Sequence, residues 1–260
     1  MLKVRAPSYR LYIFDMDGTL FRGREPTPGA VAAVNEIERG GAIVRYVTNN
    51  SSSTRDLYAA KLASMGFAAH ADQVYSSARA AADWIVAHGI ESVFLVGESG
   101  LEAEICAVGA RVLNPGPIPG CATGADAVVA GICRGITYDW IAEAMRQIMR
   151  GAQFVATNPD ATYPLEGGRL EPGAGAIVSA IQTCSSTSPI VVGKPDPYLI
   201  EIILQETGIA PGECLVVGDR VDTDIEAGRR AGCSTHLVLC GVATEAPHGQ
   251  SWSNDLTGLP

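Results

Sequence analysis

The sequence has few basic residues for its length, and this shortage limits the partners that we expect it to bind. Nineteen Lys and Arg stand against 28 Asp and Glu, so the 260 residues carry a formal net charge of -9. An acidic surface repels nucleic-acid backbones and anionic lipid heads, which argues against nucleic acid and membranes as partners. A small anionic substrate remains compatible, because a metal ion and a lysine act over short distances.

Long apolar runs and paired cysteines are also lacking. The run LYIF ends at Asp15 and is too short for a signal sequence or a membrane span, so we expect a cytoplasmic protein. The seven cysteines form no CxxC pair, which favours reduced side chains packed in the core. With 47% hydrophobic residues the chain can build a core, and its length suffices for two domains.

Apolar segments of strand length alternate with helix-like patterns. The segments expected to be strands are 11–15, 42–49, 93–97, 127–131, 154–158, 189–193, 214–219 and 235–239. The segments expected to be helices are 28–40, 54–66, 78–89, 138–151, 175–184, 197–208 and 222–232. This alternation predicts an α/β fold with a doubly wound, Rossmann-like parallel sheet. The polar C-terminal tail, 249–260, is expected to be loose.

Polar residues gather at the C-terminal ends of four expected strands. They are Asp15 with Asp17, the Thr48-Asn49-Asn50 run, Lys194 after Gly193, and Asp219. Ligands of open parallel sheets bind at the carboxyl ends of strands, so the four segments predict one composite site. None of them falls between about 80 and 184. We therefore expect a catalytic core of 1–79 and 185–260, with 80–184 inserted as a second, smaller α/β domain.

The segment FDMDGT carries the reacting groups. Two carboxylates at this spacing can face one side, with Gly18 allowing a sharp turn. Asp15 is expected to be a nucleophile that attacks phosphorus, and Asp17 the general acid and base. Because neighbouring carboxylates repel each other, a cation is needed, and Mg²⁺ suits their oxygen ligands. The alternative is a strand that simply ends in a D-x-D-G turn.

The other segments supply phosphate and metal ligands. Thr48, Asn49 and Asn50 offer a hydroxyl and amides for phosphate oxygens, although the same run could only cap the next helix. Lys194 would neutralise the phosphate and the nucleophile. In VVGDRVDTD, Asp219 would bind the metal and Asp224 would act from behind it on water or lysine. An acid-rich helix N-terminus is the simpler interpretation of that last segment.

In order along the chain, DMDGT, VTNN, GKPDP and GDRVDTD resemble the motifs of the haloacid dehalogenase superfamily. The resemblance implies an aspartyl-phosphate phosphatase with Mg²⁺ held by Asp15, the Asp17 carbonyl and Asp219. The second Asp distinguishes it from true dehalogenases. Thr48 and Asn49 would bind phosphate, and Lys194 would be the stabilising cation.

The insertion resembles the larger α/β cap of the NagD-like and p-nitrophenyl phosphatase-like branch, through FVATNPDATYP and RLEPGAGAIVSAI. That resemblance implies that Asn158, Asp160 and Tyr163 lie near the leaving group, and that the protein forms a homodimer through the cap. It also implies a further helix and a last strand after residue 244, where this chain has only its polar tail.

Three functions follow as alternatives. The first is a hydrolase of small phosphomonoesters, whether phosphoglycolate or sugar, polyol, nucleotide or p-nitrophenyl phosphates. The others are a phosphomutase or phosphotransferase with the same aspartyl-phosphate, and a non-catalytic phosphosugar-binding module, which would be expected to have lost Asp15, Asp17, Lys194 or Asp219. Because the cap loop from Asn158 to Leu165 has no Lys or Arg, we favour a polyol or sugar phosphate over phosphoglycolate.

Overall fold

The computed structural model describes residues 8–114, 124–165 and 169–260. The strands are β1 (Leu11–Asp15), β2 (Phe21–Arg22), β3 (Glu25–Pro26), β4 (Ile43–Thr48), β5 (Val74–Ser76), β6 (Ser92–Val96), β7 (Arg111–Val112), β8 (Ala127–Ala130), β9 (Gln153–Ala156), β10 (Thr162–Pro164), β11 (Leu170–Pro172), β12 (Ile190–Val191), β13 (Cys214–Gly218), β14 (Ser234–Val238) and β15 (Trp252–Ser253). The helices are α1 (Ala30–Arg39), α2 (Arg55–Ser64), α3 (Ser77–Ala87), α4 (Ser99–Ala107), α5 (Tyr138–Met149), α6 (Ala174–Ser185), α7 (Tyr198–Thr207) and α8 (Glu226–Arg230), with a π-helical turn, η4 (Val221–Ile225), before α8.

Strands from both ends of the chain build a six-stranded sheet in the order β15-β14-β13-β1-β4-β5, and all its neighbours are parallel. Alternate residues of β1 face opposite sides. Leu11 and Ile13 join the cluster that includes α7 and α8, whereas Tyr12 and Phe14 join the cluster that includes α1 and α2. A sheet covered on both faces accounts for the nearly continuous apolar sequence of its central strands.

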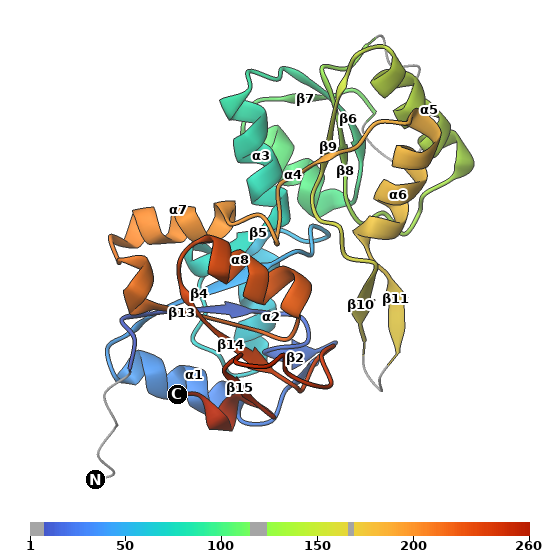
Figure 1. Cartoon of the computed structure of the whole chain (residues 1–260). Coiled ribbons are helices and arrows are strands. Elements are labelled where there is room, and N and C mark those ends of the chain that lie inside the picture. Colours follow the sequence, from blue (N-terminus) through green and yellow to red (C-terminus); the bar gives the residue numbers. More distant parts are fainter. Residues whose placement is uncertain (1–7, 115–123, 166–168) are drawn as a thin grey trace.

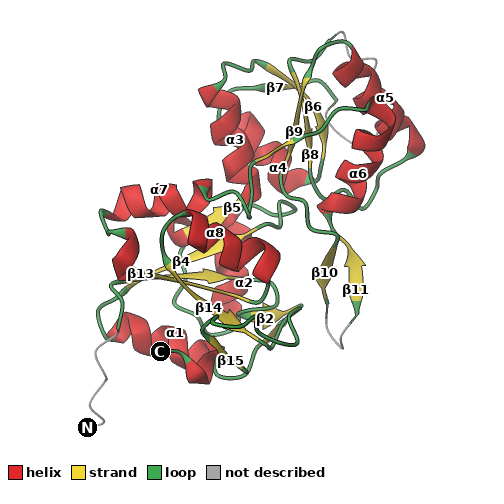
Figure 2. Cartoon of the chain, viewed as in Figure 1, coloured by secondary structure: helices red, strands yellow, loops and turns green. Residues whose placement is uncertain are grey.

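The middle of the chain builds a second parallel sheet, in the order β12-β9-β8-β6-β7. Residues of α5 and α6 pack on one face, and those of α3 and α4 pack on the other. The antiparallel pair β10-β11 leaves this part of the molecule as a projecting hairpin (Figure 1). Figure 2 shows the two sheets, each with its own helices, as separate parts of the molecule. We propose that they mark a catalytic core and an inserted cap.

The predicted α/β fold with Rossmann-like parallel sheets is confirmed, but several elements differ from expectation. The short strands β5, β7, β10 and β11 were not predicted. The strand before Lys194 shortens to β12 and pairs with β9 of the second sheet, so the chain crosses to the core after Val191 and not at residue 184. Helix α4 was not expected from the sequence. The tail is not loose, because β15 pairs with β14 and Leu256 is buried.

Two further expectations concern the cysteines and membranes. Cys133, Cys214 and Cys233 are buried as expected, whereas Cys106 and Cys184 are exposed and Cys121 lies outside the described residues. In the described part of the chain no helix combines the length and the apolar character that crossing a membrane requires.

Candidate active site

The turn after β1 places two carboxylates at the centre of the first sheet. β1 lies between β13 and β4, and Asp15 pairs in register with Val47. Gly18 has a φ of 96°, and a Cβ atom there would lie 2.4 Å from Asp219 Oδ2. Only glycine combines that backbone conformation with so close an approach, which is why the turn needs it. The carboxyl ends of β1, β4 and β13 therefore meet at one edge, as the sequence predicts.

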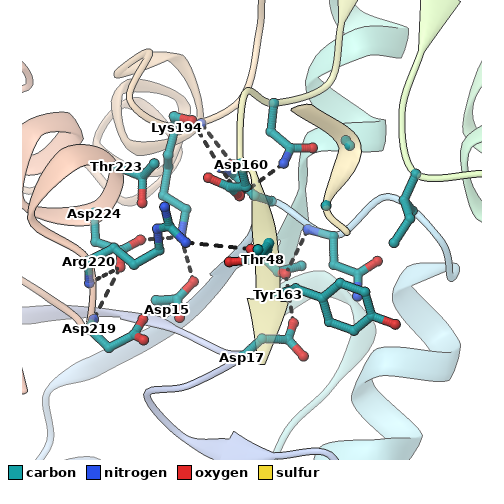
Figure 3. Close-up of a pocket in the computed structure, with 17 residues that line it drawn as sticks. Asp15, Asp17, Thr48, Asp160, Tyr163, Lys194, Asp219, Arg220, Thr223 and Asp224 are labelled. Atoms are coloured by element: carbon teal, nitrogen blue, oxygen red, sulfur yellow. Dashed lines mark hydrogen bonds and ion pairs between the residues drawn. The ribbon is translucent and has the colours of Figure 1, made fainter. Parts of the chain in front are cut away.

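Lys194 joins the two acidic segments. Its Nζ donates to Asp15 Oδ1 at 2.5 Å and to Asp224 Oδ1 at 2.6 Å (Figure 3). The lysine side chain is only 3% exposed. Burial alone would lower its pKa, but the two carboxylates raise it above its ordinary value, so the ammonium stays charged. The loop after β12 therefore carries a fixed cation from the cap sheet into the core.

Asn49 anchors that loop. Its side chain accepts from the Lys194 backbone N–H and donates to the Lys194 carbonyl, both at 2.9 Å. It also donates to Asp160 Oδ2 at 2.9 Å. The Asn50 side chain accepts from Ser52 N–H at 3.0 Å, as in a helix-capping turn. Both amide hydrogens and the amide oxygen of Asn49 are thus engaged within the protein, whereas Asn50 uses its amide oxygen in the turn and lines the pocket. Phosphate binding by these two residues stays a prediction.

Asp219 and Asp224 differ in how far their carboxylate oxygens remain free to bind a cation. Both Asp224 oxygens are occupied, one by Lys194 and the other by the backbone N–H groups of Asp219 and Arg220 at 3.1 and 3.0 Å. Asp219 accepts from Val242 N–H through Oδ2 at 2.6 Å, and within the described parts of the chain its Oδ1 has only a long contact of 3.5 Å with the Thr19 hydroxyl. Asp219 is therefore the better placed of the two to bind a cation directly.

The acidic cluster fits a divalent cation. Asp15, Asp219 and Asp224 each offer an oxygen, and these atoms lie within 4.8 Å of one another. Asp15 Oδ2 is buried without a hydrogen-bond partner among the described residues. Burial and then Asp224 raise the pKa of Asp15 well above its usual value, and the same causes raise that of Asp219 to about 7. A hard cation with oxygen ligands would reverse these shifts by favouring the ionised carboxylates.

Asp17 stands apart from this cluster. Its Oδ2 accepts from the Thr48 hydroxyl at 3.2 Å, and the same hydroxyl accepts from Asn50 N–H at 3.0 Å. Burial raises the pKa of Asp17, against opposing effects from Lys61 and the Thr48 hydrogen bond. A carboxyl with a raised pKa can carry a proton and release it, as an acid–base group must. In Figure 3 it lies on the side of Tyr163, with the metal-ligand candidates on the other side.

The cap contributes the three residues that the sequence motif singles out. Asn158, Asp160 and Tyr163 all line the pocket that contains Asp15 and Asp17. Asp160 Oδ2 accepts from Asn49 and from Asn158, each at 2.9 Å, while its Oδ1 is buried without a partner among the described residues. Asp160 therefore joins the cap to the loop that positions Lys194.

Two arginines near the site were missed by sequence reasoning. Arg220 lines the pocket and donates to the Thr162 carbonyl of β10 at 3.5 Å, so the core also contacts the cap hairpin. Its place between the motif residues Asp219 and Asp224 was a usable signal. Arg134 donates to the Tyr163 hydroxyl at 2.7 Å. It follows β8 in an unremarkable loop, and no local pattern links it to residue 163.

The geometry agrees with family comparisons. The model of the haloacid dehalogenase-like hydrolases matches residues 12–111, and an HAD-hydrolase-like model matches residues 191–256. A glycerol-3-phosphate phosphatase of Gallus gallus is 38% identical, over 89% of this chain and 80% of its own length. An acid sugar phosphatase of Staphylococcus aureus is 35% identical, over 91% and 88% respectively.

Solved structures give the same relationship. Glycerol phosphate phosphatase Rv1692 of Mycobacterium tuberculosis, in complex with magnesium, superposes with a TM-score of 0.86 at 35% identity, over 97% of this chain and 76% of that one. NagD of E. coli superposes with a TM-score of 0.84 at 30% identity, over 98% and 99%. The expected branch with a large cap is thus represented among the structural neighbours.

Proposed function

Because the chain belongs to the haloacid dehalogenase-like hydrolases, we propose that it is a magnesium-dependent phosphatase of small phosphomonoesters that acts through an aspartyl-phosphate on Asp15. One observation carries the proposal. A buried lysine holds one oxygen of Asp15 at 2.5 Å and leaves the other oxygen without a partner among the described residues, in a pocket shared with Asp17. A fixed carboxylate of this kind is suited to attack on phosphorus.

The reaction has two displacements on phosphorus. In the first, an Asp15 oxygen forms the new bond to phosphorus while the bond to the leaving oxygen breaks, and Asp17 gives that oxygen its proton. In the second, Asp17 takes a proton from water as the water oxygen attacks, and the bond between Asp15 and phosphorus breaks. Asp17 is then protonated again for the next cycle, so acid and base are the same group. Its raised pKa supports this double role.

The remaining groups position and neutralise charge. Lys194 compensates the negative charge of Asp15 and of the phosphate. Asn49 holds the Lys194 backbone, and the Thr48 hydroxyl orients Asp17. Asp15, the Asp17 carbonyl and Asp219 would hold Mg²⁺, with Asp224 supporting them from behind. The cation, when bound, supplies charge neutralisation for the phosphoryl oxygens.

We favour a polyol or sugar phosphate as the substrate. The two curated relatives named above are a glycerol-3-phosphate phosphatase and an acid sugar phosphatase. The basic side chains that approach the site beyond the cap loop are engaged within the protein, since Arg134 pairs with Glu98 and Arg220 with Asp222. Lys61, on the Asp17 side, lies over the Phe21 ring, 3.8 Å from its centre. A second carboxylate on the substrate would thus meet few uncommitted cations. A preference for phosphoglycolate in a substrate panel would contradict this choice.

The test is phosphate release from a panel of small esters, with Mg²⁺ or with EDTA, by the wild type and by Asp15→Asn. We expect release that needs Mg²⁺, is fastest with glycerol or sugar phosphates, and falls below a few per cent in the variant, because an amide is a poor nucleophile of the same shape. Release that survives EDTA would contradict the metal requirement. Release that survives in Asp15→Asn would contradict the nucleophile.

A further inference from the structure

The pocket at Asp15 has little room beyond a phosphoryl group. Its cavity volume is about 50 Å³, enclosed by the motif residues and by cap residues such as Asn158 and Asp160. A single water needs about 10–15 Å³ of such cavity volume, so this space holds a few water-sized groups, which is the scale of one phosphoryl group with its oxygens. The organic part of a phosphomonoester must extend into a neighbouring space.

A second pocket adjoins the first across Asp17. Its volume is about 210 Å³, and it shares Asp17, Asn50 and Tyr163 with the first pocket. Its other walls come from the core loop with Ser52 and Ser53, from α2, and from the cap. A general acid must lie within hydrogen-bond reach of the leaving oxygen, so the leaving group of a substrate bound at Asp15 enters the pocket on the Asp17 side.

Tyr163 stands at the boundary between the two pockets, and its hydroxyl points away to a charged network. The hydroxyl accepts from Arg134 Nη2 at 2.7 Å and donates to the Glu171 carboxylate. The Arg134 guanidinium also lies 5.4 Å from the centre of the Tyr163 ring. Since the hydroxyl is engaged by Arg134 and Glu171, the ring itself and not the hydroxyl is what Tyr163 presents to the two pockets.

Arg134 is fixed in turn by Glu98. Its Nη1 donates to Glu98 Oε2 at 2.7 Å, and its backbone N–H donates to Glu98 Oε1 at 2.9 Å. Arg134 also forms a longer ion pair with Glu171, with 3.8 Å between Arg134 Nε and Glu171 Oε2. One arginine between two glutamates keeps no net positive charge for an anionic ligand, and this arrangement suits a group that orients a neighbour.

We propose that Arg134 is a positioning residue that, held by Glu98, fixes the Tyr163 ring as one wall of the leaving-group pocket and thereby sets the affinity for small polyol phosphates. The inference rests on the proposed function, because it takes Asp17 as the acid for the leaving group. A two-stranded hairpin such as β10-β11 has little stability of its own, so the ring depends on these side-chain contacts.

The test compares Arg134→Met, Tyr163→Phe and the double variant with glycerol 3-phosphate as substrate and inorganic phosphate as competitive inhibitor. Losing one charge-assisted hydrogen bond corresponds to about a tenfold rise in KM, with kcat nearly unchanged. Inorganic phosphate fills only the pocket at Asp15, so its inhibition constant is expected to stay at the wild-type value. The double variant is expected to match the single ones, since both remove the same bond.

Arg146→Met is the matched control, because Arg146 forms an exposed cap ion pair with Glu143 at 3.1 Å, away from both pockets. It is expected to behave as the wild type, and Arg134→Lys to fall between Arg134→Met and the wild type. The inference is wrong if Arg134→Met leaves KM unchanged, if the inhibition constant of phosphate rises equally, or if the two substitutions are additive.

Binding keeps the two proposals distinguishable. Glycerol 3-phosphate binding to Asp15→Asn, with and without Arg134→Met, is measured by calorimetry and needs no turnover. If Arg134→Met weakens binding to Asp15→Asn, the positioning role is supported even when the wild type hydrolyses no ester. In that case the proposed function alone fails. Equal binding by Asp15→Asn with and without Arg134→Met overturns the inference, even if the wild type is an active phosphatase.

Discussion

At the scale of single residues, the site depends on Gly18, which lets the turn that carries Asp15 and Asp17 lie against Asp219. Gly18 turns the chain after β1 with a φ of 96° and lies against Asp219, to which a Cβ atom would approach within 2.4 Å. A left-handed backbone costs a non-glycine residue about 1–2 kcal/mol, and here the added methyl group would also displace a metal-ligand candidate. The residue thus links the position of Asp15 and Asp17 to that of Asp219.

Gly18→Ala is therefore expected to lower the free energy of unfolding by more than the backbone cost alone and to raise the Mg²⁺ concentration needed for half-maximal activity. Gly41→Ala is the control, since Gly41 has a φ of 91° but no atom within 4 Å of the added carbon. Urea unfolding and a Mg²⁺ titration measure both effects. Equal behaviour of the two variants would contradict the steric argument.

The acid–base assignment predicts a dependence on the leaving group. Asp17→Asn removes the proton donor and the base, which are typically worth about 10²- to 10⁴-fold in rate. With p-nitrophenyl phosphate the leaving phenolate needs no proton, so the first displacement is expected to proceed while the second stalls. A burst of nitrophenolate followed by slow turnover is the expected record. Normal steady-state rates in this variant would contradict the role of Asp17.

At the scale of elements, the tail is attached to the sheet by a buried histidine. His236 of β14 has both ring nitrogens hydrogen-bonded, to Ser251 and Ser253 at 2.8 Å each. Ser253 donates to the Asp255 carbonyl at 2.7 Å, so it accepts from the histidine Nε2–H. The ring is 2% exposed, and burial lowers its pKa below the ordinary value. The neutral ring is therefore the form that the fold favours.

This pKa shift predicts how stability changes with pH. Because the pKa is lower in the folded state, the contribution of His236 is present above the ordinary histidine pKa of about 6.5 and is lost as the pH falls below it. Urea unfolding at pH 7.5 and pH 5.5 is expected to show a smaller loss in His236→Gln than in the wild type. The exposed His248→Gln is the control and should keep the wild-type difference. Equal losses in all three proteins would contradict the role of His236.

How far the sequence predicts an element depends on its length and on the reach of its contacts. β1, β4 and β13 are long apolar runs, and both their positions and their polar ends follow from the sequence. β12 has two residues, too few to indicate which sheet it joins, so the route of Lys194 from cap to core could not be foreseen. The polar composition of the tail predicted that it would be loose. Its order comes from the hydrogen bonds of His236 and the burial of Leu256, which composition does not reveal.

The same limit applies within the site. The motif acids are recognisable because each follows a strand directly. The task of Asn49 depends on the backbone of Lys194, 145 residues away, and Arg134 reaches Tyr163 from another loop. Contacts of this kind form only when segments far apart in the sequence come together in the fold. Residue type alone therefore predicts that Asn49 binds a ligand, whereas in the structure its side chain holds the backbone of Lys194.

At the scale of the whole molecule, core and cap share the site. Asn49 contacts Asp160 at 2.9 Å, and farther from the pocket Arg55 of α2 pairs with Glu104 of α4 at 3.0 Å. The acidic cluster lies in the core, under these contacts. A cation bound there would therefore stabilise a molecule whose own carboxylates repel one another.

Mg²⁺ is expected to raise the melting temperature, and more so at pH 7.5 than at pH 5.5. Without metal, the pKa of Asp219 is raised to about 7 by burial, so stability falls as the pH rises from about 4 to about 7 and the group ionises. Metal binding requires the ionised form and removes this penalty. At a hundredfold excess over Kd it would contribute about 2.7 kcal/mol. Scanning calorimetry of the wild type and Asp219→Asn measures the effect, and an equal shift in the variant would contradict the site.

The central claim is that the phosphoryl group passes through Asp15, and one measurement tests it directly. Asp17→Asn is mixed with p-nitrophenyl phosphate and Mg²⁺, quenched in acid and digested, and its peptides are analysed by mass spectrometry. We predict one phosphoryl group per chain, on the peptide that contains Asp15 and absent when Asp15→Asn is added. A nitrophenolate burst with Asp15 unmodified, or phosphate on another residue, would contradict the account.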